Sequence, residues 1–179
     1  YYAPDGSSVT LSSGQLSIDH KGIMSGGFTA EGDTATVVNG KLDESKTFGT
    51  AVLVGTDGTM DLVTNIKGGG TFVPSDIQGS WYTYVTAIDA TTGAVYSAYG
   101  TVDVDGSGKV TGLFNAPDGS TVSVTDGEMV LSNEGIITGS TTLSTGDTSS
   151  IVHGKLDQAK TFGMYVSVSP TDGSMRTGY

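Results

Sequence analysis

One stretch of this 179-residue chain has the oxygen donors and spacing of a calcium-binding loop. The segment DVDGSGKV offers ligands at Asp103, Asp105 and Ser107, with glycine at the sixth position. The twelfth position is Phe114, where such loops carry a bidentate glutamate. The segment therefore has two interpretations, a calcium site or a β-hairpin turn, and its turn-forming residues favour the turn. No other cofactor is expected.

A lysine–aspartate motif occurs twice, as GKLDESKTFG and as GKLDQAKTFG. Its charged positions are Lys41, Asp43 and Lys46 in the first occurrence and Lys155, Asp157 and Lys160 in the second. One interpretation is an intramolecular cross-link between lysine and an Asn or Asp side chain. The favoured one is a hairpin turn with ion pairs, because lone Lys and Asp residues on turns are ordinary.

No catalytic constellation is visible in the sequence. His20 and His153 stand at non-equivalent places in a repeated sequence, their counterparts being Asn133 and Asn39. The chain has no cysteine, and none of its serines lies in a nucleophile elbow. We therefore predict that the protein is not an enzyme.

Four tyrosines, Tyr82, Tyr84, Tyr96 and Tyr99, lie on two neighbouring predicted strands. They could form a platform for a glycan or for another subunit, because an aromatic ring offers a flat apolar face with a polar tip. The alternative is partial burial on a sheet that has few other large residues.

The elements that carry these residues form a repeat. APDGSSVTLSSGQLSIDHKGIMSGG begins at Ala3 and APDGSTVSVTDGEMVLSNEGIITGS at Ala116, and the motif above follows in both copies. The second copy is preceded by a segment, Ile77 to Phe114, that the first copy lacks. Such duplication indicates an array of domain-sized units, and the chain is expected to begin in the middle of its first repeat.

Alternating apolar residues between Gly-rich turns predict antiparallel strands throughout. In the second copy these run near Trp81–Ile88, Val95–Asp103, Lys109–Asn115, Ser120–Leu131, Ile136–Leu143, Thr148–Leu156, Thr161–Val168 and Ser174–Tyr179. Eight meandering strands with one apolar face are best closed into a barrel, which leaves no edge. The fold class is therefore all-β, with tandem up-and-down barrels of which the first is incomplete.

Alternation also predicts which side chains face the core. It places Phe162, Met164, Val166 and Val168 on the apolar face of the second copy, and Phe48, Val52 and Val54 on that of the first. Trp81 is predicted to be a buried anchor near the closed end of the second barrel.

The expected domains are a partial barrel over residues 1–67, a linker over 68–76 and a complete barrel over 77–179. In the partial barrel the leading strand, with Val9, Leu11, Leu16 and Ile18, has an unpaired edge and no charge before Asp19. Such an edge is suited to strand addition. We therefore expect self-association in which a segment of a neighbouring copy pairs with this strand head to tail.

Composition excludes several kinds of partner. The formal net charge is -11, which disfavours nucleic acid and anionic membrane surfaces. No apolar run is long enough for a membrane helix. A Gly-rich, cysteine-free repeat suits an exported bacterial protein, so an extracellular or cell-surface location is expected.

The stretch DIQGSWYTYV, with Gly79 and Trp81 opening a predicted meander barrel, resembles the first-strand signature of the lipocalin-like (calycin) group. With the late Gly-x-x-Asp-x-x-Lys-Thr segment, the repeat also resembles units of large bacterial cell-surface proteins. The resemblance implies a β-barrel fold, and lipocalins carry a ligand inside the barrel.

These observations favour a structural repeat unit of an extracellular bacterial surface protein or filament. The alternative is a binding module, either for a glycan on the tyrosines or for a small apolar ligand in the barrel. A calcium-dependent adhesin is the third interpretation.

Overall fold

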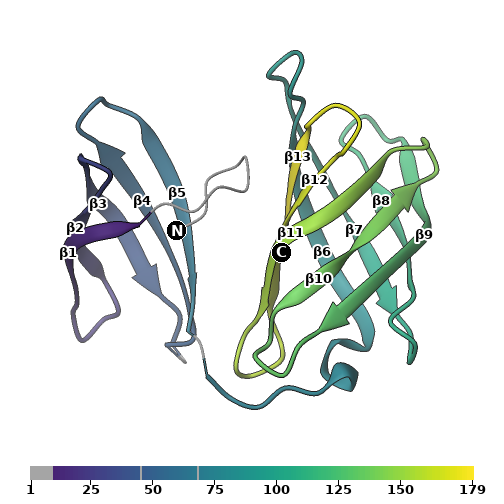
Figure 1. Cartoon of the computed structure of the whole chain (residues 1–179), viewed down its shortest axis with the longest axis horizontal. Coiled ribbons are helices and arrows are strands. Elements are labelled where there is room, and N and C mark those ends of the chain that lie inside the picture. The colour runs from purple at the N-terminus through teal and green to yellow at the C-terminus, as the bar shows by residue number, and fades with distance from the viewer. Residues whose placement is uncertain (1–9, 45, 68) are drawn as a thin grey trace. The chain divides into compact units, whose positions relative to one another are not determined.

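The computed structural model describes residues 10–44, 46–67 and 69–179, and within them it contains strands and one short 3₁₀ helix. The chain forms two compact units, the first ending at Lys67 and the second running from Gly68 to Tyr179 (Figure 1). Every named strand pairs antiparallel with its neighbours. The prediction of an all-β protein is confirmed.

The second unit is a closed eight-stranded barrel. Its strands are β6 (Gly79–Ile88), β7 (Val95–Val104), β8 (Val110–Asn115), β9 (Thr121–Leu131), β10 (Ile137–Leu143), β11 (Thr148–Leu156), β12 (Gly163–Val168) and β13 (Met175–Gly178). Consecutive strands pair along the chain, and β13 returns to pair with β6. The predicted barrel is therefore confirmed.

Side chains that alternate inward along these strands fill the barrel. Val110 and Leu156 are almost fully buried, and Leu131 and Ile137 lie in the same cluster. Since successive residues of a strand point to opposite faces, the neighbour Val130 is exposed on the outer face.

One end of the barrel is capped by residues that precede the first strand. Phe72 is buried in the core cluster, and the 3₁₀ helix η1 (Pro74–Ile77) places Ile77 in the same cluster. The side chain of Trp81 packs half-buried against this cluster, and its Nε1 donates a hydrogen bond of 2.7 Å to the carbonyl of Ile77. From Phe72 onward, the segment expected to be a linker thus belongs to the barrel, because two large apolar side chains gain by burial there.

Charged side chains fasten this cap. The Nζ atoms of Lys155 and Lys160 each lie 5.7 Å from the centre of the Phe72 ring. Lys160 also forms an ion pair of 2.8 Å with Asp76 of the 3₁₀ helix. Both lysines belong to the second lysine–aspartate motif. That motif therefore helps to hold the capping segment on the end of the barrel.

The first unit is an open sheet with the strand order of the chain. Its strands are β1 (Leu11–Ile18), β2 (Met24–Ala30), β3 (Asp33–Leu42), β4 (Phe48–Gly55) and β5 (Met60–Ile66). Its pairing matches that of β9–β13 in detail. A bulge interrupts the β3–β4 ladder between Val37 and Asn39 and the β11–β12 ladder between Ile151 and His153, which are the equivalent positions.

The predicted core face of β12 is wrong. Tyr165 and Ser167 line the barrel interior, so Met164, Val166 and Val168 face outward. In β4 the buried residues are likewise Gly49, Ala51 and Leu53, on the opposite face from Val52 and Val54. Apolar residues occur on both faces of these strands, so hydrophobicity alone did not define the inner one. Phe48 and Phe162, predicted to face the core, are both half-buried, and Phe48 lies on the face of β4 opposite Leu53.

Candidate functional site

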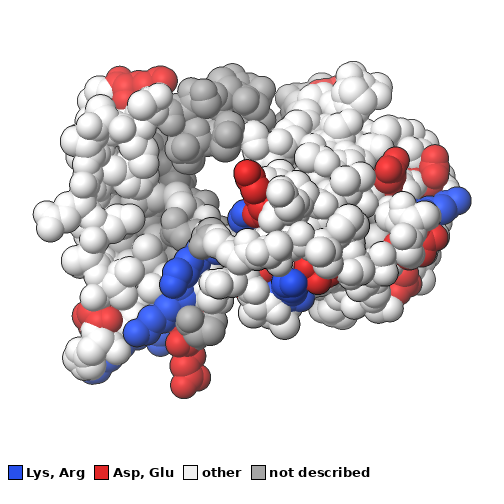
Figure 2. Space-filling model, turned by 60° about the horizontal axis from the view of Figure 1, so that its bottom comes forward, with Lys and Arg blue, Asp and Glu red and all other residues white. Residues whose placement is uncertain are grey.

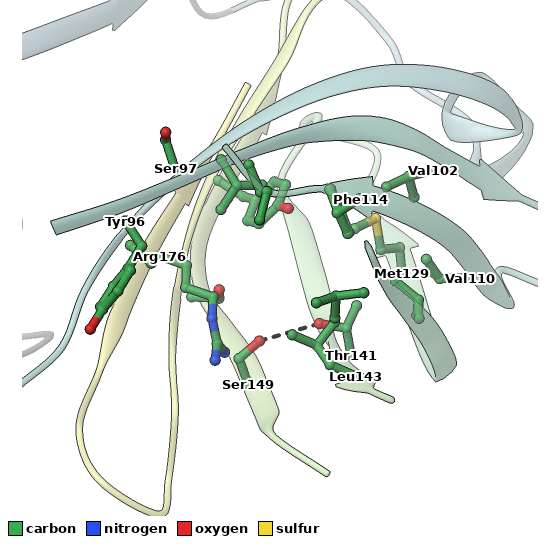
Figure 3. A pocket seen from close by; sticks show the side chains of 18 residues that line it. Tyr96, Ser97, Val102, Val110, Phe114, Met129, Thr141, Leu143, Ser149 and Arg176 are labelled. Atoms are coloured by element: carbon green, nitrogen blue, oxygen red, sulfur yellow. Dashed lines mark hydrogen bonds between the residues drawn. The ribbon is translucent and has the colours of Figure 1, made fainter. Parts of the chain in front are cut away.

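A cavity of about 190 Å³ lies inside the barrel, at the end opposite the cap (Figure 3). Its wall is mainly apolar and includes Val85, Ala98, Phe114, Val124 and Leu143. These side chains come from the parts of five strands that adjoin the uncapped end.

The floor of this cavity consists of Val102, Met129 and Tyr165. All three also line a second space of about 50 Å³ that extends toward Trp81 and Ile77. They therefore separate the main cavity from the capped end.

Arg176 carries the one charged side chain among the described residues that line the main cavity. It lies on β13 opposite Ala87 of β6 and Ser167 of β12, both of which face inward. Figure 3 shows its guanidinium inside the ring of lining side chains, on the side of Ser149. The strand pairing thus directs the positively charged guanidinium of Arg176 into the apolar cavity.

The guanidinium of Arg176 is incompletely paired. Its Nη2 lies 4.0 Å from Oδ2 of Asp147, and its side chain is only 17% exposed. Its Nη1 is buried, and no described residue accepts a hydrogen bond from it. A buried donor without a partner costs free energy, so this atom is a prospective contact for a ligand.

Neutral hydroxyl groups lie on the same wall. The hydroxyls of Thr141 and Ser149 are 3.2 Å apart, and Ser149 and Ser167 are buried. Burial raises the pKa of Tyr165 to about 12, although the positive charge of Arg176 acts in the opposite direction. The Tyr165 hydroxyl is therefore protonated at neutral pH.

Sequence reasoning missed this site. One signal in the sequence pointed to it. Arg176 is the single arginine of the chain, and it lies in a predicted strand whose side chains alternate between the two faces. Its inward direction could be assigned only once the pairing of β13 with both β12 and β6 was known.

The four tyrosines do not form one platform. Tyr82 and Tyr84 of β6 and Tyr99 of β7 lie on the outer face, where Tyr84 stands directly opposite Tyr99. Tyr96 lines the cavity instead. The reason is the odd spacing between Tyr96 and Tyr99, which puts them on opposite faces of one strand.

The aspartate-rich segment forms the turn between β7 and β8. Oδ1 of Asp105 accepts hydrogen bonds from the backbone N–H groups of Ser107 (2.8 Å) and Lys109 (3.0 Å), and from the Ser107 hydroxyl (2.7 Å). Asp103 accepts one from the hydroxyl of Ser80. In the described part of the chain, no group of three or more Asp, Glu or His side chains could hold a metal ion.

Stability should fall in acid because carboxylates of this kind recur in the turns. Hydrogen bonds to neighbouring hydroxyls and N–H groups lower the pKa of Asp105 and Asp118, and lower that of Asp89 and Asp172 as well. A carboxyl with a lowered folded-state pKa stabilises the fold above its ordinary pKa and loses that contribution as pH falls through the lowered value. We therefore expect the urea midpoint of the barrel to decrease from pH 5 toward pH 2 (roughly the carboxyl range). An unchanged or rising midpoint would contradict this, and Asp118→Asn should flatten the decrease.

In the lysine–aspartate motif, the aspartate closes a turn. Oδ1 of Asp157 accepts hydrogen bonds of 2.8 Å from the N–H groups of both Thr161 and Phe162. Asp43 has the same pair of bonds in the first unit. Lys155 donates to the carbonyl of Glu134, so neither lysine of the second motif pairs with Asp157.

The predicted assembly edge is the edge strand of the open sheet. Among the described residues β1 pairs with β2 alone, and Leu11, Leu16 and Ile18 are each about half exposed. Val9 lies outside the described residues.

In the view of Figure 2, uncharged side chains cover most of the visible surface. The acidic and basic residues lie in small separate groups. None of the described residues forms a helix that is long and apolar enough to cross a membrane.

Comparison with known proteins gives little beyond this description. No family model matches the chain, and no curated protein matches it. Among solved structures it is similar to a DUF3598-family protein of unknown function from Nostoc punctiforme, with 9% identity and a TM-score of 0.31. That likeness covers 92% of this chain and 85% of the other. The eight-stranded antiparallel barrel is itself consistent with a lipocalin-like fold.

Proposed function

We propose that the barrel of residues 68–179 is a binding module for a small, largely apolar molecule. The observation that carries this proposal is the apolar cavity of about 190 Å³ at the uncapped end. A dry cavity of about 150 Å³ takes up benzene, so a ligand part with roughly six to ten carbon atoms fits this volume. Binding sites of this kind are concave, mostly apolar and provided with a few polar groups.

The test is titration of the full chain with 1-octanol, followed by two-dimensional NMR. Saturable shifts are expected for the amides of β7, β9 and β10. Filling the cavity with Ala98→Leu should abolish them, because Ala98 lines it. Thr101→Leu is the matched control, since Thr101 is exposed on the outer face of the same strand. The proposal fails if octanol causes no saturable shift, or equal shifts in both variants.

A second proposal concerns the first unit: its open sheet is an incomplete barrel that another copy of the repeat completes. Support comes from the shared register, in which β1 corresponds to β9 and β5 to β13. In the barrel, β9 pairs with β8 and β13 pairs with β6. Both edges of the open sheet therefore correspond to strands that have partners.

This second role is structural: a repeat unit of an extracellular bacterial surface protein or filament, joined by strand addition at Leu11, Leu16 and Ile18 of β1. The half-exposed apolar side chains of that strand would gain burial against an added strand. A contact of this kind between copies, head to tail, repeats without closing.

Hydrogen exchange of the full chain tests the strand-addition proposal. Addition of a polypeptide with the sequence of residues 77–116 is expected to slow exchange of the β1 and β5 amides. A scrambled polypeptide of the same composition is the control. Equal exchange with both polypeptides, together with a monomer at all concentrations in sedimentation, would refute the proposal.

A further inference from the structure

We infer that the ligand of the barrel carries an anionic head group, which pairs with Arg176 inside the cavity. A carboxylate is the head group that we propose. This inference rests on the proposed binding of an apolar ligand by the barrel. It adds the chemical class of that ligand and its orientation, with the apolar part toward the floor formed by Val102, Met129 and Tyr165.

The first argument is the pairing of the guanidinium. Nη2 faces Asp147 at 4.0 Å, and the Asp147 side chain is 57% exposed, so this pair is long and lies toward solvent. Nη1 is buried and has no hydrogen-bond acceptor among the described residues. A planar carboxylate that accepts from Nη1 would satisfy this donor through a charge-assisted hydrogen bond.

The second argument is the character of the remaining wall. The polar groups on the wall include the hydroxyls of Ser149, Thr141 and Ser167, which are neutral and able to donate. No Asp or Glu is among the described residues that line the cavity. The cavity is thus complementary to one negative charge with an apolar body.

The third argument concerns the acidic groups around Arg176. Asp147 lies in the turn before β11. Asp172 lies in the turn before β13, where hydrogen bonds from Ser174 and Ser169, and to a lesser extent the charge of Arg176, lower its pKa. These carboxylates are outside the cavity lining, and they repel an anion that stays in solvent. Recognition therefore requires the ligand to insert its head group past them, to the buried side of the guanidinium.

The test compares octanoate with 1-octanol on the full chain by calorimetric and NMR titration. Octanoate should bind at least about tenfold more tightly, as expected for a hydrogen bond between charged groups. Arg176→Met should remove this preference and leave the octanol affinity within about threefold. Lys109→Met, which removes one positive charge from the exposed turn at the other end of the barrel, should leave both affinities unchanged.

The probes also distinguish the sources of the anion. Octyl sulfate and octyl phosphate test whether any anionic head group suffices, and inorganic phosphate tests an anion without a tail. We expect the alkyl anions to compete with octanoate and inorganic phosphate to fail. Competition by inorganic phosphate alone would overturn the inference, because the apolar wall would then play no part.

The two proposals fail in different ways. If octanol and octanoate bind equally to the unaltered protein, the head-group inference is wrong while the apolar binding site stands. If neither binds, both are wrong. Should Arg176→Met lose its dispersed NMR spectrum, Arg176→Lys replaces it, and it should bind octanoate more tightly than octanol. Loss of that preference in a folded Arg176→Lys protein would show that the bond needs the guanidinium geometry.

Discussion

Replacement of Trp81 by alanine is expected to lower the free energy of unfolding of the barrel by about 3–5 kcal/mol. The indole packs against the core cluster from β6, at the capped end. Its Nε1 holds the carbonyl of Ile77 at 2.7 Å, so its loss also releases the 3₁₀ helix that covers this end. Both the ring and the bond contribute to the expected loss.

Urea denaturation followed by circular dichroism measures the effect of Trp81→Ala, because Trp81 is the only tryptophan and its fluorescence disappears with it. Trp81→Phe separates the two contributions, since it keeps a ring and loses a hydrogen bond of about 1 kcal/mol. Tyr82→Ala is the matched control, because Tyr82 is 74% exposed on the next position of the strand. Equal stability of the Trp81→Ala and Tyr82→Ala proteins would show that the indole is not an anchor.

Replacement of Asp157 by alanine is expected to cost about 3 kcal/mol, because three backbone N–H groups of the turn would lose a charged acceptor that is itself buried. The side chain is only 2% exposed. Besides the two bonds of Oδ1 to Thr161 and Phe162, Oδ2 accepts a bond of 3.2 Å from the N–H of Ala159. The turn that these bonds close also holds Lys160 at a φ of 61°, a conformation that non-glycine residues seldom adopt.

Asp105→Ala is the control for Asp157→Ala, because Asp105 makes the same kind of bonds in a turn that is exposed to water. Water replaces a lost acceptor there, so its cost should be well below that of Asp157→Ala. Thermal unfolding of the two variants under the same conditions measures this difference in stability. A smaller loss of stability for Asp157→Ala than for Asp105→Ala would mean that burial of the aspartate does not determine how much its hydrogen bonds stabilise the turn.

Much of the fold could be predicted from local pattern. The eight barrel strands begin and end within two residues of the expected positions, because turn residues such as those of PDGS and TDGS interrupt each run of alternating apolar residues. Closure also followed from pattern, since eight short strands joined by tight turns leave two edges that can pair with each other.

Other features depended on contacts that the sequence does not contain. Phe72 follows three glycines, a pattern that is typical of a linker, yet it is buried and both Lys155 and Lys160 lie over its ring. The valines of β12 predict the wrong inner face, because Tyr165 and Ser167 are the residues that line the interior. In each case, long-range packing decided between two arrangements that the local sequence allowed equally.

The candidate site shows the same division. The sequence by itself determined that the chain is an all-β protein with two similar stretches of sequence and one arginine near its last predicted turn. Only the tertiary structure decided that Arg176 points into an apolar cavity, because the direction of a side chain on a strand depends on the register with both neighbours. The cavity depends likewise on residues from several strands that meet only when the barrel closes.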